Sequence, residues 1–261
     1  MRVSVIIPMY NAEKTILKCL KSVVTQLPST DMEVVIVNDG SKDDSFNIVK
    51  AFIEESSFDI NLINQENKGV SAARNLAIAK SKYDLLALID SDDVWLPNKL
   101  NHQLEILKKY NVDFVGTLHN NMALGFPYKL EDDIFRVTFE KLMIKMAPST
   151  ITSLFKKSIL EKTGGYDENQ KYTEDGNLWL RISKNASMVI INKNYAIAGD
   201  LKPLYGQSGL SGNLKGMYQG ELKNLDDVLK LGYINKLEYF LYKTYISLKY
   251  YRRIVVVKLR K

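Results

Sequence analysis

Residues 34–45 read VVIVNDGSKDDS, and residues 85–95 read LLALIDSDDVW. Each stretch is a short run of apolar residues that changes abruptly to Asp, Asn, Ser or Gly. Runs this short and this rich in Val, Ile and Leu are typical of strands buried on both faces, as in a parallel sheet. Ligands of open parallel sheets bind at the carboxyl ends of the strands, so these polar residues mark the expected site.

The same alternation covers the first 117 residues and predicts strands separated by helices. Helical spacing of apolar residues indicates a helix after a capping Asn11, a second after the turn at 41–44, a third at 70–79 and a fourth beginning near Pro97. The fold class is therefore α/β, with a Rossmann-like, mainly parallel sheet flanked by helices. The expected strands are 3–7, 34–37, 60–64, 85–89 and 114–115.

The second half of the chain has a mixed pattern. No linker rich in Pro, Gly or Ser separates it from the first half, so we expect one domain over 1–220 with a helical, basic and aromatic C-terminal extension over 221–261. The expected elements are a helix at 138–146, a strand at 151–155, a turn at 164–166 and a helix at 174–183.

The composition limits which disulfides, metal sites and membrane segments the chain can have. The single cysteine, Cys19, rules out an intramolecular disulfide and a CxxC motif. Two histidines leave little material for a His-rich metal site, so any metal should be held by carboxylates. The apolar run near the amino terminus is too short for a signal peptide, and no run approaches the roughly 20 residues of a membrane span. We expect a cytoplasmic protein.

The net charge of +6 is concentrated in the tail. Residues 236–261 hold eight Lys or Arg and one Glu, so the rest of the chain is almost neutral and is not expected to bind nucleic acid. Five tyrosines are interleaved with these basic residues. Such a segment suits the inner leaflet of a membrane, where the protein would be peripheral; the alternative is a helix packed on the domain with its polar face in solvent.

The strongest local feature is the acidic stretch after the strand at 85–89. Asp90 and Asp92 can present oxygen ligands to Mg²⁺ or Mn²⁺ in one crevice. The alternative is a solvated turn in which Asp92 or Asp93 caps the next helix.

Five segments in order closely resemble family 2 glycosyltransferases, which have the GT-A fold and transfer a sugar from a nucleotide diphosphate with inversion and the help of a divalent metal. The resemblance covers about residues 1–185. The segments are SVIIPMYNAE at 4–13, VVIVNDGSKDDS at 34–45, NKGVSAARN at 67–75, LLALIDSDDVW at 85–95 and TEDGNLWLRI at 173–182.

The resemblance implies a nucleotide-binding half at about 1–117 and an acceptor-binding half at about 118–220. Asp39 is expected to hydrogen-bond the base, usually uracil, and Asp92 to ligate the Mn²⁺ or Mg²⁺ ion together with Asp90. The nucleotide site is expected to comprise Pro8, Tyr10, Glu13, Asp39, Gly69, Arg74, Asp90 and Ser91.

Asp175 matches the general base of the family, which takes the proton of the acceptor hydroxyl. Local alternatives stay open: Glu174 and Asp175 can simply cap a helix, Asp39-Gly40-Ser41 can be a plain turn, and Arg74 can form a surface ion pair. Contacts with the donor or acceptor sugar are expected from Asp93, Glu174, Trp179, Gln207 and Ser208.

Two departures from the family pattern matter. Processive members carry Gln-x-x-Arg-Trp and transmembrane helices, whereas here neither Trp95 nor Trp179 follows an Arg, so we expect one sugar per acceptor. The glycine-rich stretch at 206–213 lacks the basic or histidine residue that many members place near the diphosphate, and it is either an active-site lid or a surface loop.

The partners that the resemblance implies are a nucleotide-sugar donor, expected to be a UDP-sugar, and a glycan or lipid-linked acceptor of bacterial lipopolysaccharide, capsule or other surface polysaccharide synthesis. Two other functions are considered. A sugar-nucleotide pyrophosphorylase needs a glycine-rich phosphate loop after the first strand, where residues 8–11 read PMYN. A membrane-surface adaptor without enzymatic activity would use the tail alone.

Overall fold

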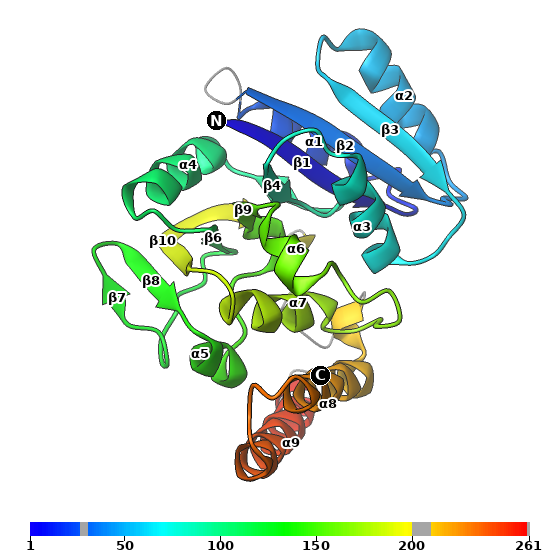
Figure 1. Cartoon of the computed structure of the whole chain (residues 1–261). Coiled ribbons are helices and arrows are strands. Elements are labelled where there is room, and N and C mark those ends of the chain that lie inside the picture. The colour runs from blue at the N-terminus through cyan, green and yellow to red at the C-terminus, as the bar shows by residue number, and fades with distance from the viewer. Residues whose placement is uncertain (27–30, 200–209, 260–261) are drawn as a thin grey trace.

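The computed structural model describes residues 1–26, 31–199 and 210–259. The described residues form a ten-stranded sheet with helices on both faces (Figure 1). The strands are β1 (Arg2–Met9), β2 (Asp31–Asp39), β3 (Ile60–Gln65), β4 (Leu85–Leu88), β5 (Val94–Trp95), β6 (Phe114–His119), β7 (Leu130–Glu131), β8 (Ile134–Val137), β9 (Leu154–Lys156) and β10 (Met188–Ile197).

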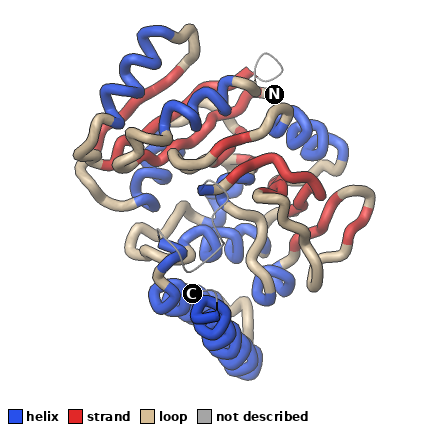
Figure 2. The backbone as a smooth tube through the Cα atoms, turned by 180° about the vertical axis from the view of Figure 1, so that it is seen from behind, coloured by secondary structure: helices blue, strands red, loops and turns tan. Residues whose placement is uncertain are grey.

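The helices cover the sheet in layers, as the view from behind also shows (Figure 2). Short 3₁₀ turns occur at Thr150–Thr152 and Leu210–Gly212. The α-helices are α1 (Ile16–Val24), α2 (Ser45–Glu55), α3 (Val70–Lys80), α4 (Lys99–Lys109), α5 (Phe139–Ile144), α6 (Ile159–Thr163), α7 (Glu174–Ser183), α8 (Leu214–Lys230) and α9 (Lys236–Leu259).

The first half of the sheet is parallel, as predicted. The order is β3-β2-β1-β4, with β1 pairing in parallel with both β2 and β4. Side chains of β1 alternate between two cores: Val5 and Ile7 pack with α1 and α4 on one face, and Ile6 packs with α3 on the other. This alternation is why the strand reads as a continuous apolar run.

The second half of the sheet is mixed. Strand β9 lies between β4 and β6 and is antiparallel to both, whereas β10 is parallel to β6 and antiparallel to β8. The order continues β4-β9-β6-β10-β8-β7, with β5 paired to β10. The parallel and antiparallel parts together keep the carboxyl ends of β1, β2, β4 and β6 on one edge of the sheet.

One predicted helix start is wrong. Helix α1 begins at Ile16 after Thr15, not after Asn11, which has a φ of 48° and accepts a hydrogen bond from the amide of Lys42 at 2.8 Å. Helix α4 begins at Lys99, near Pro97 as predicted, and its N-cap is Asn98, so neither Asp92 nor Asp93 caps it.

The expected domain boundary at residue 220 falls inside α8. Leu225 and Val228 of α8 and Ile246 of α9 belong to the same core as the sheet and α7. The last two helices are therefore packed parts of the domain, at the end of the molecule farthest from β2 and β3 (Figure 1). Within the described ranges, no helix is long and apolar enough to cross a bilayer.

Candidate active site

A polar cleft of about 1120 Å³ opens at the carboxyl ends of β1, β2 and β4. It contains most of the residues expected to bind the nucleotide and the metal, namely Pro8, Tyr10, Asp39, Gly69, Arg74, Asp90, Ser91 and Asp92. Asp93 and Glu174, which were expected to contact a sugar, line it too. The five sequence segments thus meet at one place.

Asp39 is buried at the end of β2 and is held by the loop before α3. Its carboxylate accepts hydrogen bonds from the backbone amides of Lys68 at 2.8 Å and Gly69 at 2.9 Å, and from the side-chain amide of Gln65 at 2.6 Å. Gly69 has a φ of 91°, a conformation that favours glycine. Since a carboxylate has about four acceptor positions, these bonds fix its orientation and leave it room for one more donor.

Arg74 of α3 joins two segments that are distant in the sequence. Its guanidinium donates to Asp90 at 2.8 Å and to Glu174 at 2.9 Å, and it lies 5.2 Å from the ring centre of Tyr166. Burial disfavours the charge of Arg74, but the neighbouring carboxylates raise its pKa overall. Arg74 is 4% exposed, so the alternative of a surface ion pair is wrong.

Three carboxylates follow β4 in close succession. Asp93 is buried and accepts a hydrogen bond from the amide of Gly199 at 2.8 Å. Burial and the negative charges of Asp90 and Asp92 raise the pKa of Asp93 to about 8. A cation bound here would relieve this crowding of negative charge.

The carboxylate oxygens of Asp90 and Asp92 suit a hard cation that also binds water and substrate phosphates. Among residues 1–26, 31–199 and 210–259, no three His, Cys, Asp or Glu side chains converge as a ready metal site. Mg²⁺ uses one or two protein carboxylates together with substrate phosphates, so Asp92 and Asp90 fit that mode of binding.

Glu174 and Asp175 begin α7 and face different cavities. Glu174 lines the polar cleft and is bound by Arg74, whereas Asp175 lines a neighbouring cavity. Thr150 donates to Asp175 at 3.2 Å, and the amide of Gly176 donates at 2.7 Å. Burial raises the pKa of both carboxyls, and the charge of Asp175 raises that of Glu174 further.

The neighbouring cavity has a volume of about 720 Å³ and largely apolar walls. It lies between the sheet, α5, α7 and the last two helices. His119 and Ser149 line both this cavity and the polar cleft, so the two spaces adjoin.

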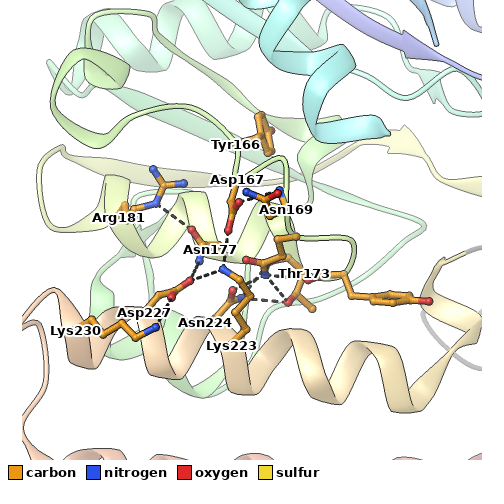
Figure 3. Close-up of polar contacts among 12 residues, drawn as sticks. Tyr166, Asp167, Asn169, Thr173, Asn177, Arg181, Lys223, Asn224, Asp227 and Lys230 are labelled. Atoms are coloured by element: carbon orange, nitrogen blue, oxygen red, sulfur yellow. Dashed lines mark hydrogen bonds and ion pairs between the residues drawn. The ribbon is translucent and has the colours of Figure 1, made fainter. Parts of the chain in front are cut away.

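Helix α8 holds the segment that precedes α7 (Figure 3). Lys223 donates to Asp167 at 2.6 Å and to Asp227 at 2.7 Å, and Asn224 donates to the carbonyl oxygen of Thr173 at 3.1 Å. Because Thr173 directly precedes Glu174 and Asp175, these contacts position the acidic pair.

Some predicted contacts are corrected. Trp179 is fully buried among the rings of Phe114, Phe155 and Tyr166, so it contacts no sugar. Glu13 is exposed outside the cleft, and its carboxylate accepts a hydrogen bond from the amide of Asp44 at 3.3 Å. Gln207 and Ser208 lie outside the described residues.

Other residues of the site were not predicted. Asn75 accepts from the amide of Tyr166 at 2.9 Å and donates to its carbonyl oxygen at 2.9 Å, so it holds the loop before α7 as its neighbour Arg74 holds Glu174. Its position next to Arg74 in the segment NKGVSAARN could have indicated this role. The sequence indicated His119 only by its position at the end of a strand, β6. In the structure, burial lowers the pKa of His119.

Residues 4–164 match the family model described as Glycosyl transferase family 2. The chain belongs to this family. It is 30% identical over 220 residues to an Escherichia coli protein named UDP-Glc:alpha-D-GlcNAc-diphosphoundecaprenol beta-1,3-glucosyltransferase WfgD, covering 81% of this chain and 80% of that one.

Other relatives of this glycosyltransferase are longer. An uncharacterized glycosyltransferase of Rickettsia prowazekii is 31% identical over 196 residues, which are 71% of this chain and 60% of the relative. A Rickettsia bellii relative is 29% identical, and the match spans 29% of its length.

Solved structures show the same GT-A fold. TarS of Staphylococcus aureus, residues 1–349, aligns with a TM-score of 0.71 at 21% identity, covering 94% of this chain and 70% of TarS. A mannosyltransferase of Pyrobaculum calidifontis, solved with GDP-Man and Mn²⁺, aligns with a TM-score of 0.69 at 18% identity, covering 88% of this chain and 64% of that one.

Proposed function

We propose that this glycosyltransferase transfers one sugar from a UDP-sugar to a hydroxyl of a lipid-linked acceptor, with inversion, in bacterial lipopolysaccharide, capsule or other surface polysaccharide synthesis. The observation that carries the proposal is the polar cleft, where Asp39, the ion pair of Arg74 with Asp90, and Asp92 lie together. The name of the E. coli relative, which includes both UDP-Glc and a diphosphoundecaprenol acceptor, supports the choice of substrates.

Uracil has a ring N–H from which Asp39 can accept a hydrogen bond. Its fixed carboxylate has an acceptor position left for the ring N–H of uracil, and a base without that N–H would leave the position unpaired. Pro8, Tyr10 and Gly69 line the same cleft and would contact the nucleoside. TarS has also been solved with UDP-GlcNAc, which is in keeping with a UDP donor.

Asp92 and Asp90 would hold Mn²⁺ or Mg²⁺ together with the diphosphate of the donor. The ion would neutralise the charge that develops on the leaving diphosphate. Arg74 keeps Asp90 in place through the 2.8 Å ion pair, so the orientation of this ligand is fixed before the donor binds. Asp93, Ser91 and Glu174 line the cleft beside these residues and would contact the donor sugar.

Asp175 is the proposed general base. Glu174 is engaged by Arg74, whereas Asp175 faces the cavity through which an acceptor can approach. The raised pKa of Asp175 suits a group that must take up a proton. The hydroxyl proton moves to Asp175, the oxygen bonds to the anomeric carbon, and the bond from that carbon to the diphosphate oxygen breaks, releasing UDP.

The outer face of α9 is the proposed membrane contact, which would place the enzyme on the cytoplasmic face. Ile246 packs in the core, yet an apolar stripe at helical spacing is exposed on the opposite side. Four exposed basic residues on the same helix, Lys236, Lys243, Arg252 and Lys258, would add about 1 kcal/mol each beside an anionic leaflet. The stripe comprises Leu237, Phe240, Leu241, Leu248, Tyr251, Val255 and Leu259.

A hydrolysis screen of UDP-, GDP- and TDP-sugars tests the proposal for the donor. Without an acceptor, a glycosyltransferase slowly transfers its sugar to water. We expect Mn²⁺-dependent release of UDP from at least one UDP-sugar and little from the others. Preference for a GDP-sugar would contradict the assignment of Asp39 to uracil. Preference for a TDP-sugar would contradict only the choice of UDP, because thymine has the same ring N–H as uracil. No turnover of any donor would favour the adaptor.

A further inference from the structure

The cavity beside Asp175 has the walls of a site for an apolar chain. Its lining includes four of the chain's eight methionines, from the segment after β6, from α5, from the segment that follows α5 and from α8. Methionine side chains are flexible and polarizable and adapt to apolar ligands of irregular shape. The four are Met122, Met143, Met146 and Met217.

The cavity also has a positive end formed by the last two helices. Lys249 and Arg253 of α9 line it, and each forms an ion pair with Glu221 of α8, at 3.3 Å and 3.0 Å. Two cationic side chains therefore lie together at this end of the cavity. Such a group complements a phosphate.

Positions along α8 relate this positive end to Asp175. Asn224 donates to the carbonyl oxygen of Thr173, two residues before Asp175. Glu221 precedes Asn224 by three residues and therefore lies on the same side of α8, about 4.5 Å further along the helix axis. An acceptor hydroxyl bound at Asp175 and a phosphate bound at Lys249 and Arg253 would therefore belong to neighbouring parts of one acceptor molecule.

We propose that this cavity binds the apolar chain of the acceptor, and that the acceptor is a sugar joined through phosphate or diphosphate to an alkyl or isoprenoid chain. The inference rests on the proposed function, because it takes Asp175 as the base. Three features support it: the volume of about 720 Å³ lies in the range of about 300–1,000 Å³ common for ligand sites, the cavity adjoins the donor cleft through His119 and Ser149, and Lys249 and Arg253 line one end of it.

Calorimetric titration with farnesyl diphosphate, a soluble isoprenoid diphosphate, tests the cavity directly. EDTA is present so that the diphosphate does not enter the donor cleft through a metal ion. We expect saturable binding with a negative heat-capacity change, which marks the burial of apolar surface. Farnesol and inorganic diphosphate should each bind at least about tenfold more weakly, because each lacks one half of the recognised structure.

Met217→Trp fills the cavity from its half-buried wall on α8, and we expect it to weaken farnesyl diphosphate binding about tenfold or more. Met217→Leu conserves volume and should keep the affinity. Leu231→Trp, at an exposed position after α8 and outside the cavity, is the matched control. Met122→Trp, in the loop on the opposite wall, repeats the test if Met217→Trp fails to fold.

Absence of farnesyl diphosphate binding, or equal affinity in wild type and both tryptophan variants of the cavity, would overturn the proposal. Equal affinity for farnesol would overturn the assignment of Lys249 and Arg253 to a phosphate. UDP binding in the presence of Mn²⁺ is measured on the same samples. Its loss alone would contradict the proposed donor site, whereas its retention without farnesyl diphosphate binding would contradict only the cavity.

Discussion

Two neighbouring carboxyl groups at the start of α7 are expected to have different roles. Asp175→Asn should reduce transfer about 10²- to 10⁴-fold, the usual contribution of a general base, while UDP affinity stays near that of the wild type. The reason is that Asp175 lines the apolar cavity and not the donor cleft. Steady-state transfer rates and UDP calorimetry check this, and an equal loss of both would indicate a structural role.

Asp92 is the residue on which the metal should depend most. It is exposed in the cleft, so Asp92→Asn should leave the fold intact. We expect loss of Mn²⁺-dependent transfer in a variant with an unchanged thermal unfolding curve. Glu54→Gln, at an exposed position of α2 outside the cleft, serves as the control. Near-normal turnover of Asp92→Asn with Mn²⁺ as the only divalent ion would contradict the metal role.

Lys99 gives the fold a pH dependence that is unrelated to catalysis. Its side chain is fully buried, donates to Gln103 at 2.8 Å and lies 4.0 Å from the ring centre of Trp95, and burial lowers its pKa well below the usual value. Between the lowered pKa of the folded protein and the unfolded pKa of about 10.4, the unfolded chain binds a proton that the folded chain excludes, so the free energy of unfolding rises with pH in this range.

We therefore expect Lys99→Met to flatten this rise between pH 8 and 9.5, where the wild type gains up to about 1.4 kcal/mol per pH unit from this group. Urea unfolding at several pH values measures the slope. Lys108→Met, an exposed position of the same helix, is the control. The same slope in wild type and Lys99→Met would show that Lys99 is charged in the folded protein.

Position at the end of an apolar strand predicted which carboxylates lie in the cleft. Asp39, Asp90 and Asp92 come at or just after the ends of β2 and β4 and line the cleft, where ligands of parallel sheets bind. Glu13, four residues after the end of β1, was also assigned to the nucleotide site but does not line the cleft. Trp179 was assigned to a sugar through the resemblance, although it follows Leu178 on the apolar face of α7, and that periodicity indicated the core. The pairing of Arg74 with Glu174, 100 residues away, is a long-range contact that no local pattern shows.

Among the elements, α8 has a specific requirement for small residues. A Cβ on Gly220 would lie 2.4 Å from the carbonyl oxygen of Tyr172 and 2.5 Å from the hydroxyl of Thr173. Gly220→Ala should therefore shift the segment that leads into Asp175. We expect lower transfer with unchanged UDP affinity, measured in the two assays used for Asp175→Asn.

Gly125→Ala is the matched control for Gly220→Ala. A Cβ at Gly125 meets no heavy atom within 4 Å, and its φ is outside the left-handed region. Full activity of Gly220→Ala would show that α8 does not position the acidic pair.

Element prediction succeeded where the pattern was regular and failed where pairing was long-range. The parallel strands β1 to β4 and helices α1 to α4 were predicted because each is a short apolar or amphipathic run between polar residues. Strand β10 was missed: only Met188–Ile191 is apolar, and the rest of the strand reads NKNYAI. Its register with β6 is also interrupted, so its pairing depends on contacts absent from any local window.

For the whole molecule, the exposed face of α9 predicts salt-dependent attachment to membranes. The wild type should sediment with anionic liposomes at low ionic strength and detach as salt rises, because the Debye length shrinks. Removal of α9 is unsuitable, since it would take Ile246 from the core and a wall from the apolar cavity. The double substitution of Leu241→Glu and Leu248→Glu changes only the exposed face of α9 and leaves the core intact, because both side chains are exposed.

We expect this double variant to lose most of its liposome binding while it keeps UDP binding. Leu231→Glu, exposed outside α9, controls for added charge. Equal sedimentation of the wild type and the double variant at low salt would rule out α9 as the attachment surface.

The cleft at the ends of β1, β2 and β4 is expected to bind uridine diphosphate together with a divalent ion. Calorimetric titration of UDP into the full chain, with Mn²⁺ and again with EDTA, measures this binding. We predict saturable, one-to-one binding that is at least about tenfold weaker in EDTA and is weakened to a similar extent by Asp92→Asn. Absence of UDP binding, or equal affinity with Mn²⁺ and with EDTA, would show that the cleft is not a metal-dependent UDP site.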